Sequence, residues 1–128
     1  MGQQQLLLIV LGVIIVGIAV VVGINVFTAS AQSANRDAVI ADLTNLSSMA
    51  QQFYRKPTAL GGGGNTFTGW VVPPAIDTTG NGIYTATVAP QSVTLVGTGN
   101  EKGNDGSAVV KVTMVVGPNA ITSTTINN

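Results

Sequence analysis

The side chains that could do chemistry form few clusters in this sequence. The segment "TGNEKGNDGS" brings together Glu101, Asn104 and Asp105, whose oxygens are of the type that Ca²⁺ prefers. Their spacing does not match a calcium loop, so an ordinary solvated hairpin is favoured. The run "GGGG" at 61–64 lacks the Lys-Ser/Thr of a phosphate-binding loop, which favours a flexible linker. The sequence therefore predicts no metal and no cofactor.

Two further motifs also favour structural interpretations. The tripeptide "NLS" at 45–47 fits the pattern of a glycosylation acceptor, but it lies inside a predicted helix. The segment "FYRKP" at 53–57 places two aromatic residues and two cations where that helix is expected to end. Packing against a sheet and charges at a helix terminus are the favoured interpretation of this segment.

Composition excludes several classes of function. The 128 residues contain no Cys and no His, which removes disulfides, thiolate nucleophiles and the usual zinc ligands. Five basic and five acidic side chains cancel, so a nucleic-acid partner is not expected. Charged residues make up 8% of the chain, well below the roughly 25% of a typical soluble domain. A non-enzymatic protein with surface covered by other protein is the expectation.

An apolar run of 22 residues dominates the N-terminal part of the chain. It extends from Leu6 to Phe27 and is interrupted only by Gly12, Gly17, Gly23 and Asn25. As a helix it would span roughly 33 Å, which matches the hydrocarbon core of a bilayer. The three glycines favour close helix packing over local unwinding, although spacing alone does not separate the two.

The helix is expected to continue past the apolar run. Residues 28–56 contain neither Gly nor Pro, and Pro57 then ends the helix. Five residues recur at intervals of three and four and should form one apolar stripe against a sheet: Val39, Leu43, Leu46, Ala50 and Phe53. The pattern predicts a helix of about 50 residues, roughly 75 Å long.

Alternating, Thr- and Val-rich segments follow the glycines and predict an antiparallel meander. Strands are expected near residues 66–72, 83–89, 92–97, 108–116 and 121–126. The pairs Asn81-Gly82 and Asp105-Gly106 are typical of tight hairpin turns with positive φ angles.

The predicted fold class is α+β, with a long N-terminal helix and a small C-terminal antiparallel sheet. The helix occupies residues 1–56, with an apolar first half and an amphipathic second half, the stem. A Gly-rich linker covers 57–65 and a sheet head domain covers 66–128.

This layout and the opening "QLLLIVLGVIIVGIAVVVG" resemble those of type IV pilins and related pilin-like filament subunits. The resemblance implies removal of a short leader by prepilin peptidase, an assembly machinery, and passage through the inner or cytoplasmic membrane. It also implies a helical homopolymer outside the cell, whose core is made of packed helices.

One position departs from the family pattern. Such pilins usually carry a glutamate at the fifth mature position. If the mature chain starts at Met1, the fifth residue is Gln5, which can hydrogen-bond an amine without supplying charge. If it starts at Gln3, the fifth residue is Leu7. Pilin-like chains without this glutamate exist, so the resemblance stands.

Two rival interpretations of the apolar run remain open. A single-span membrane protein with an external sheet domain fits its length, but no Lys or Arg precedes the run. A secretory signal cleaved after Ala31 fits the small residues "ASA" at 29–31, but signals carry a basic start and a shorter apolar stretch.

The sequence thus predicts a structural subunit of an extracellular filament that is membrane-embedded before assembly. The residues expected to pack in the filament core are Leu6, Leu7, Leu8, Ile9, Leu11, Gly12, Ile14, Val16, Gly17, Val20, Gly23, Ile24 and Phe27. A polar start precedes them, formed by Gln3, Gln4 and Gln5.

Overall fold

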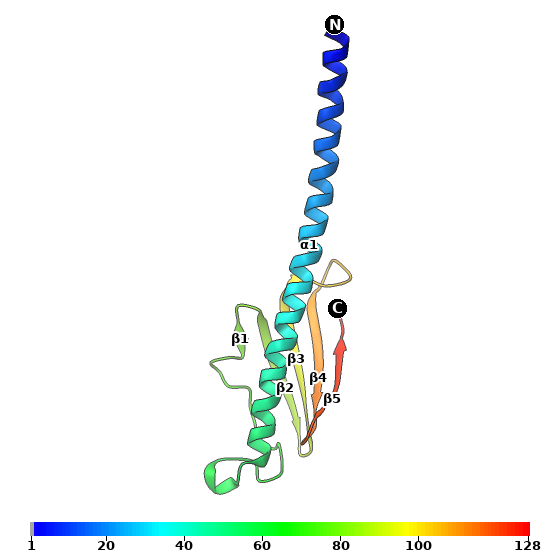
Figure 1. Ribbon diagram of the computed structural model, residues 1–128. Helices are drawn as coiled ribbons and strands as arrows, with labels where there is room; N and C mark the ends of the chain where they lie inside the picture. Colours follow the sequence, from blue (N-terminus) through cyan, green and yellow to red (C-terminus); the bar gives the residue numbers. More distant parts are fainter. Residues whose placement is uncertain (1) are drawn as a thin grey trace. The chain divides into compact units, whose positions relative to one another are not determined.

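The computed structural model describes residues 2–128 and confirms the predicted fold class (Figure 1). The helix α1 runs from Gly2 to Arg55, and a short 3-10 helix, η1, follows at Thr58–Leu60. Five strands complete the chain: β1 (Thr78–Thr79), β2 (Gly82–Ala89), β3 (Ser92–Lys102), β4 (Val109–Val116) and β5 (Ile121–Ile126).

The chain divides into two compact units within α1. The first ends at Ala31, and the second comprises Gln32–Asn128. The stem therefore belongs to the same unit as the sheet. The glycine run also belongs to this unit, because the amides of Gly63 and Gly64 donate to carbonyls in the last turn of the helix and just beyond it, those of Phe53 and Lys56.

The sheet is an antiparallel meander in the order β1-β2-β3-β4-β5, as the turn pattern predicts. Neighbouring strands place residues opposite one another across the sheet. Leu95 of β3, for example, lies opposite Ala86 of β2 on one side and Met114 of β4 on the other. In β4 the buried residues alternate strictly and leave Lys111 exposed on the opposite face. Alternation thus gives the sheet one face for the helix and one for its surroundings.

The stem packs on the apolar face of this sheet and forms the core with it (Figure 1). The stem approaches β3 closely at Gly97, where an added Cβ would lie 2.6 Å from Val39 Cγ1. Gly99 likewise allows Asn35 of the stem to lie close to β3, since an added Cβ would lie 2.1 Å from Asn35 Oδ1. These glycines explain why β3 continues to Lys102, beyond the predicted end at Gly97, because they admit the helix and do not turn the chain.

The predicted strand at 66–72 is wrong. The structure has no strand there, and the amide of Trp70 donates to the carbonyl of Phe67 in a turn. Gly69 has a φ of 93°, which extended backbone does not allow. Phe67 and Trp70 are both buried, so this segment contributes two anchors to the core as a loop.

One of the two predicted turns is also placed differently. The β1–β2 hairpin turns at Gly80 and Asn81, while Gly82 is the first residue of β2 and pairs with Thr79. Gly82 is needed for a close approach, since an added Cβ would lie 2.1 Å from the Thr98 carbonyl oxygen. Gly106 has the predicted positive φ, 70°, in the β3–β4 loop.

Candidate assembly surface

The first unit presents an apolar surface that the rest of the described chain does not cover. Every residue from Gly2 to Ser30 is exposed. Among its large apolar side chains the exposed fraction ranges from 52% at Ile14 to 76% at Phe27. Because exposed apolar area raises the free energy in water, this helix needs an apolar environment supplied from outside the chain.

All residues predicted to pack in a filament core lie on this exposed segment, distributed around the whole helix. The structure places the following side chains there: Leu6, Leu7, Leu8, Ile9, Leu11, Ile14, Val16, Val20, Ile24 and Phe27. A helix that is apolar all round is typical of a fully surrounded position in a protein core or a membrane. By length and composition α1 could span a membrane, and it is the one such helix in residues 2–128.

Three glycines interrupt the apolar surface without disturbing the helix. Nothing lies within 4 Å of a Cβ added at Gly12, Gly17 or Gly23, so no intrachain contact explains them. Each leaves a notch where a second helix can approach closely. The polar start, Gln3 to Gln5, is helical and exposed as well, and the first charged residue of the chain is Arg36.

The predicted helix-to-sheet residues lie at the interface of the stem with the sheet. Val39, Leu43, Leu46 and Ala50 are fully buried, and Phe53 is half-buried against the same core. They meet Tyr84, Val93, Leu95, Val110, Val112, Met114 and Val116 from the sheet, together with Phe67 and Trp70 from the loop before β1. The stem is thereby fixed to the sheet by apolar packing.

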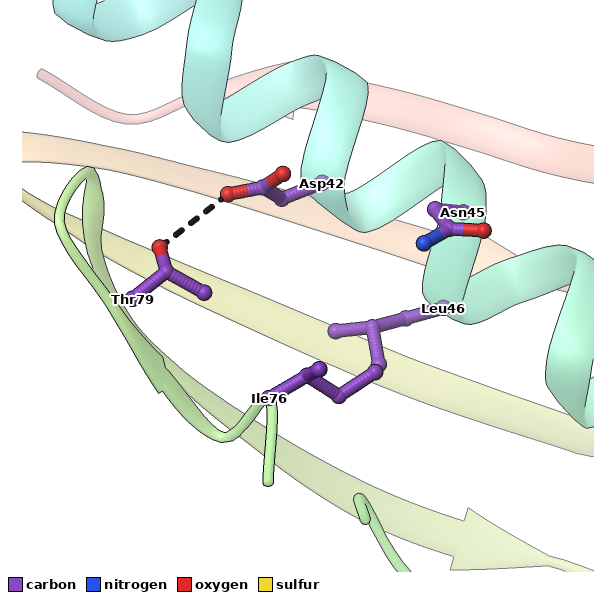
Figure 2. Close-up of a pocket in the computed structure, with 5 residues that line it drawn as sticks. All are labelled: Asp42, Asn45, Leu46, Ile76 and Thr79. Atoms are coloured by element: carbon purple, nitrogen blue, oxygen red, sulfur yellow. Dashed lines mark hydrogen bonds between the residues drawn. The ribbon is translucent and has the colours of Figure 1, made fainter. Parts of the chain in front are cut away.

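A polar network that the sequence analysis did not identify also ties the stem to the sheet. The carboxylate oxygen Oδ2 of Asp42 accepts hydrogen bonds from Thr79 Oγ1 (3.2 Å), Asn81 Nδ2 (3.1 Å) and Tyr84 Oη (2.5 Å). Figure 2 shows Asp42 reaching from α1 towards Thr79 at the β1 hairpin. No local sequence pattern predicts this network, because Asp42 lies about 40 residues from its donors in the chain.

This network shifts two pKa values. Partial burial raises the pKa of Asp42, but the hydrogen bonds from Tyr84, Asn81 and Thr79 together outweigh it and hold the pKa below its usual value. Burial and the hydrogen bond to Asp42 raise the pKa of Tyr84 to about 12. Asp42 is therefore charged and Tyr84 neutral at neutral pH, which suits a fixed donor–acceptor pair.

A small pocket beside Asp42 offers little room for a ligand. It is lined by Asp42, Asn45, Leu46, Ile76 and Thr79 (Figure 2) and has a volume of about 60 Å³. That is room for one or two water molecules. We therefore assign it to the packing of the β1 hairpin on the stem.

Asn35 and Arg36 hold the other end of the stem. Asn35 donates to the carbonyl of Asn81 (2.9 Å) and accepts from the amides of Asn100 and Glu101. Arg36 donates to Asn104 Oδ1 at 2.7 Å. These bonds fasten the β1 turn and the end of β3 to the helix.

Two of the three residues weighed as calcium ligands, Asn104 and Asp105, already accept hydrogen bonds through their side-chain oxygens. Asp105 Oδ1 accepts from the amides of Ser107 and Ala108, which lowers the pKa of Asp105. Asn104 Oδ1 is taken by Arg36 and Gln32. Across residues 2–128 no group of three His, Cys, Asp or Glu side chains is placed to hold a metal ion.

Comparison of the chain with protein families, with curated proteins and with solved structures found no match. The architecture itself is type IV pilin-like: a long apolar N-terminal helix followed by a small antiparallel sheet. That helix is compatible with embedding in a membrane.

Proposed function

We propose that this protein is a non-enzymatic structural subunit that polymerises through Leu6–Phe27 into an extracellular type IV pilus-like filament. The observation that carries the proposal is a 22-residue helical segment exposed on every face and free of charge. In such a filament the segments of neighbouring subunits pack around a common axis, and the sheets form the outer surface.

The energetics favour assembly once the segment has left lipid. Burial of roughly 1,000 Å² of apolar surface per subunit would stabilise the polymer over water by about 25 kcal/mol, before the entropic cost of association. Lipid is itself apolar, so burial gains little in the membrane. Extraction therefore needs an energy-driven assembly machinery, and the pilin-like architecture adds prepilin peptidase as a second partner.

A membrane-anchored monomer with a ligand-binding sheet is the second candidate, and the same apolar segment supports it. The two differ in what surrounds the segment, which is lipid in the anchor and other copies of this chain in the filament. The notches at Gly12, Gly17 and Gly23 favour the filament, because they suit neighbouring helices better than disordered lipid. A secreted domain that begins at Gln32 is the third candidate.

Negative-stain microscopy of material sheared from intact cells tests the proposal, together with the intact mass of its main small protein. Filaments containing a subunit that retains Leu6–Phe27 are expected, and the mass determines whether the mature chain begins at Met1 or Gln3. A soluble species that begins at Gln32 would contradict the proposal.

A charge in the apolar segment should abolish the filaments. Val16→Asp places a carboxylate where no described polar group could pair with it, and an unpaired charge in a dry core is very costly. The matched control is Val71→Asp, since Val71 is also an exposed apolar residue, 69% against 61%, but lies on the second unit. Filaments that persist in Val16→Asp would show that the segment is not a packed core.

A further inference from the structure

The sheet ends in an outer strand, β5, that has a neighbouring strand on one side. All six residues of β5 are exposed, and within residues 2–128 β5 pairs with β4 alone. Monomeric proteins usually shield such an edge with charged residues, prolines or a covering element. The sequence of β5, "ITSTTI", contains no charge and no proline, and its one irregularity lies near its start, between Ile121 and Ser123.

The register shows which backbone groups of β5 are free. The amide of Asn127 donates to the Lys111 carbonyl, and the Lys111 amide donates to the Asn128 carbonyl, so the backbone of Asn127 faces β4. Because hydrogen-bonded pairs alternate along an antiparallel ladder, Thr125 and Ser123 also face β4. The N–H and C=O groups of Thr124 and Ile126 consequently point away from the sheet.

The opposite edge of the sheet carries a matching free segment. The two-residue strand β1 covers only the start of β2, at Gly82 and Ile83, and the Tyr84 amide donates to the Asp77 carbonyl. By the same alternation, Ala86 and Val88 point their backbone groups outward, and they have no backbone partner on that side among residues 2–128. This segment is likewise free of charge and proline.

The two free segments lie at the same level of the sheet. The cross-strand row from Ala86 passes through Leu95 and Met114 and ends at Thr124. A row one step further runs from Thr87 through Thr94 and Val115 to Ser123. Two copies placed side by side at one height therefore bring β5 of one copy level with β2 of the next.

Strand direction selects the partner. In an antiparallel meander β5 runs opposite to β2, so copies that share one orientation present these strands to each other as an antiparallel pair. Pairing of β5 with another β5 in the same antiparallel way would instead require copies in opposite orientations. A filament whose helices all point one way excludes that arrangement. Because the two edges are different surfaces, the contact is heterologous and can repeat from one copy to the next along a filament.

We infer that β5 of one subunit adds as a strand to the free part of β2 of the adjacent subunit. This inference rests on the proposed filament, since the filament supplies the common orientation. The stem covers one face of the sheet, with β5 on one side of it and, on the β2 side, the segment that leads into β1 (Figure 1). Edge pairing would join the heads laterally, in addition to the packed apolar segments.

Cysteine cross-linking of filaments tests this inference against a clean background, because the chain has no cysteine of its own. The double variant Thr87→Cys/Ser123→Cys places one thiol on β2 and one on β5, both at exposed positions. Oxidation, or a short bifunctional maleimide that tolerates a register shift, should give a ladder of covalent oligomers. The control Thr87→Cys/Ser107→Cys moves the second thiol to the β3–β4 loop at the far end of the sheet and should give no ladder.

A backbone variant then tests whether hydrogen bonding, and not mere proximity, makes the contact. In the double-cysteine background, Thr124→Pro removes the outward N–H, which the sheet itself does not use, and should abolish the ladder while filaments persist. Thr124→Val keeps the N–H and should retain the ladder.

The outcomes separate the two proposals. Filaments without a ladder would overturn edge pairing and leave the filament intact. Dimers from Ser123→Cys alone would replace it with pairing between two β5 strands. The absence of filaments from unmodified cells would overturn the proposed function, and edge pairing with it.

Discussion

Tyr84 donates its phenolic hydrogen to Asp42 across the interface of stem and sheet, with 2.5 Å between Oη and Oδ2. The tyrosine ring is buried in the core, while its hydroxyl reaches the carboxylate on α1. One residue therefore contributes to both the apolar packing and the polar network. This pair adds a directional contact between the stem and β2 to the apolar packing.

Removal of this carboxylate should destabilise the second unit. Asp42→Ala leaves Thr79, Asn81 and Tyr84 without their acceptor, and hydrogen bonds to a charged group contribute about 2 kcal/mol to stability. Urea unfolding of the full chain in detergent, followed by fluorescence of the single, buried Trp70, measures the loss. Asp37→Ala is the matched control, because Asp37 is exposed on the same helix. Equal losses in the two variants would show that the network does not stabilise the fold.

The same carboxylate should make stability depend on acid. Because the pKa of Asp42 is lowered in the folded state, the unfolded chain binds its proton first as the pH falls. The contribution is complete above about pH 5 and is lost as the pH falls through about 4 towards the folded pKa. The urea midpoint should follow this course and fall less steeply in Asp42→Ala. Asp105, whose pKa is also lowered, contributes to the slope that remains.

Gly97 should not tolerate a side chain. An added Cβ would lie 2.6 Å from Val39 Cγ1 and 3.1 Å from Tyr84 Cε1, so the stem would have to move away from β3. We expect Gly97→Ala to lower the free energy of unfolding by about 1 to 3 kcal/mol, the usual cost of overpacking a core. Gly80→Ala provides the comparison, since nothing lies within 4 Å of its added Cβ. A stable Gly97→Ala would mean that the stem sits farther from the sheet.

The glycines of the apolar segment can be tested by size. If Gly12, Gly17 and Gly23 admit neighbouring helices, Leu at these positions should reduce filament yield, whereas Ala should be tolerated. Ala also strengthens a helix by up to about 1 kcal/mol relative to Gly. If the glycines serve local unwinding instead, Ala should impair assembly as well. Filament mass per cell for the paired Ala and Leu variants distinguishes the two roles.

The periodicity of apolar residues correctly predicts the buried face of each element that packs against a single partner. The stripe from Val39 to Phe53 follows the helical repeat because the stem contacts a single sheet, and β4 alternates because it has one covered face. The segment 66–72 misleads the same reasoning. Phe67 and Trp70 enter the core from a turn, and their spacing of three is that of the first and last residues of a β-turn, which strand alternation does not reveal.

Composition and local repeats are enough to predict the long helix, its apolar first half, the meander of strands and the absence of Cys and His chemistry. Which polar groups meet depends on the tertiary structure. Asp42 finds Tyr84, Asn35 finds Asn81, and Gly97 admits Val39 through contacts between residues far apart in the chain. Local propensities do not encode such pairs, since they arise from the angle and height at which the stem crosses the sheet. The free edges of β2 and β5 also depend on the tertiary structure, because the edges of a sheet are defined only by the order in which its strands pair.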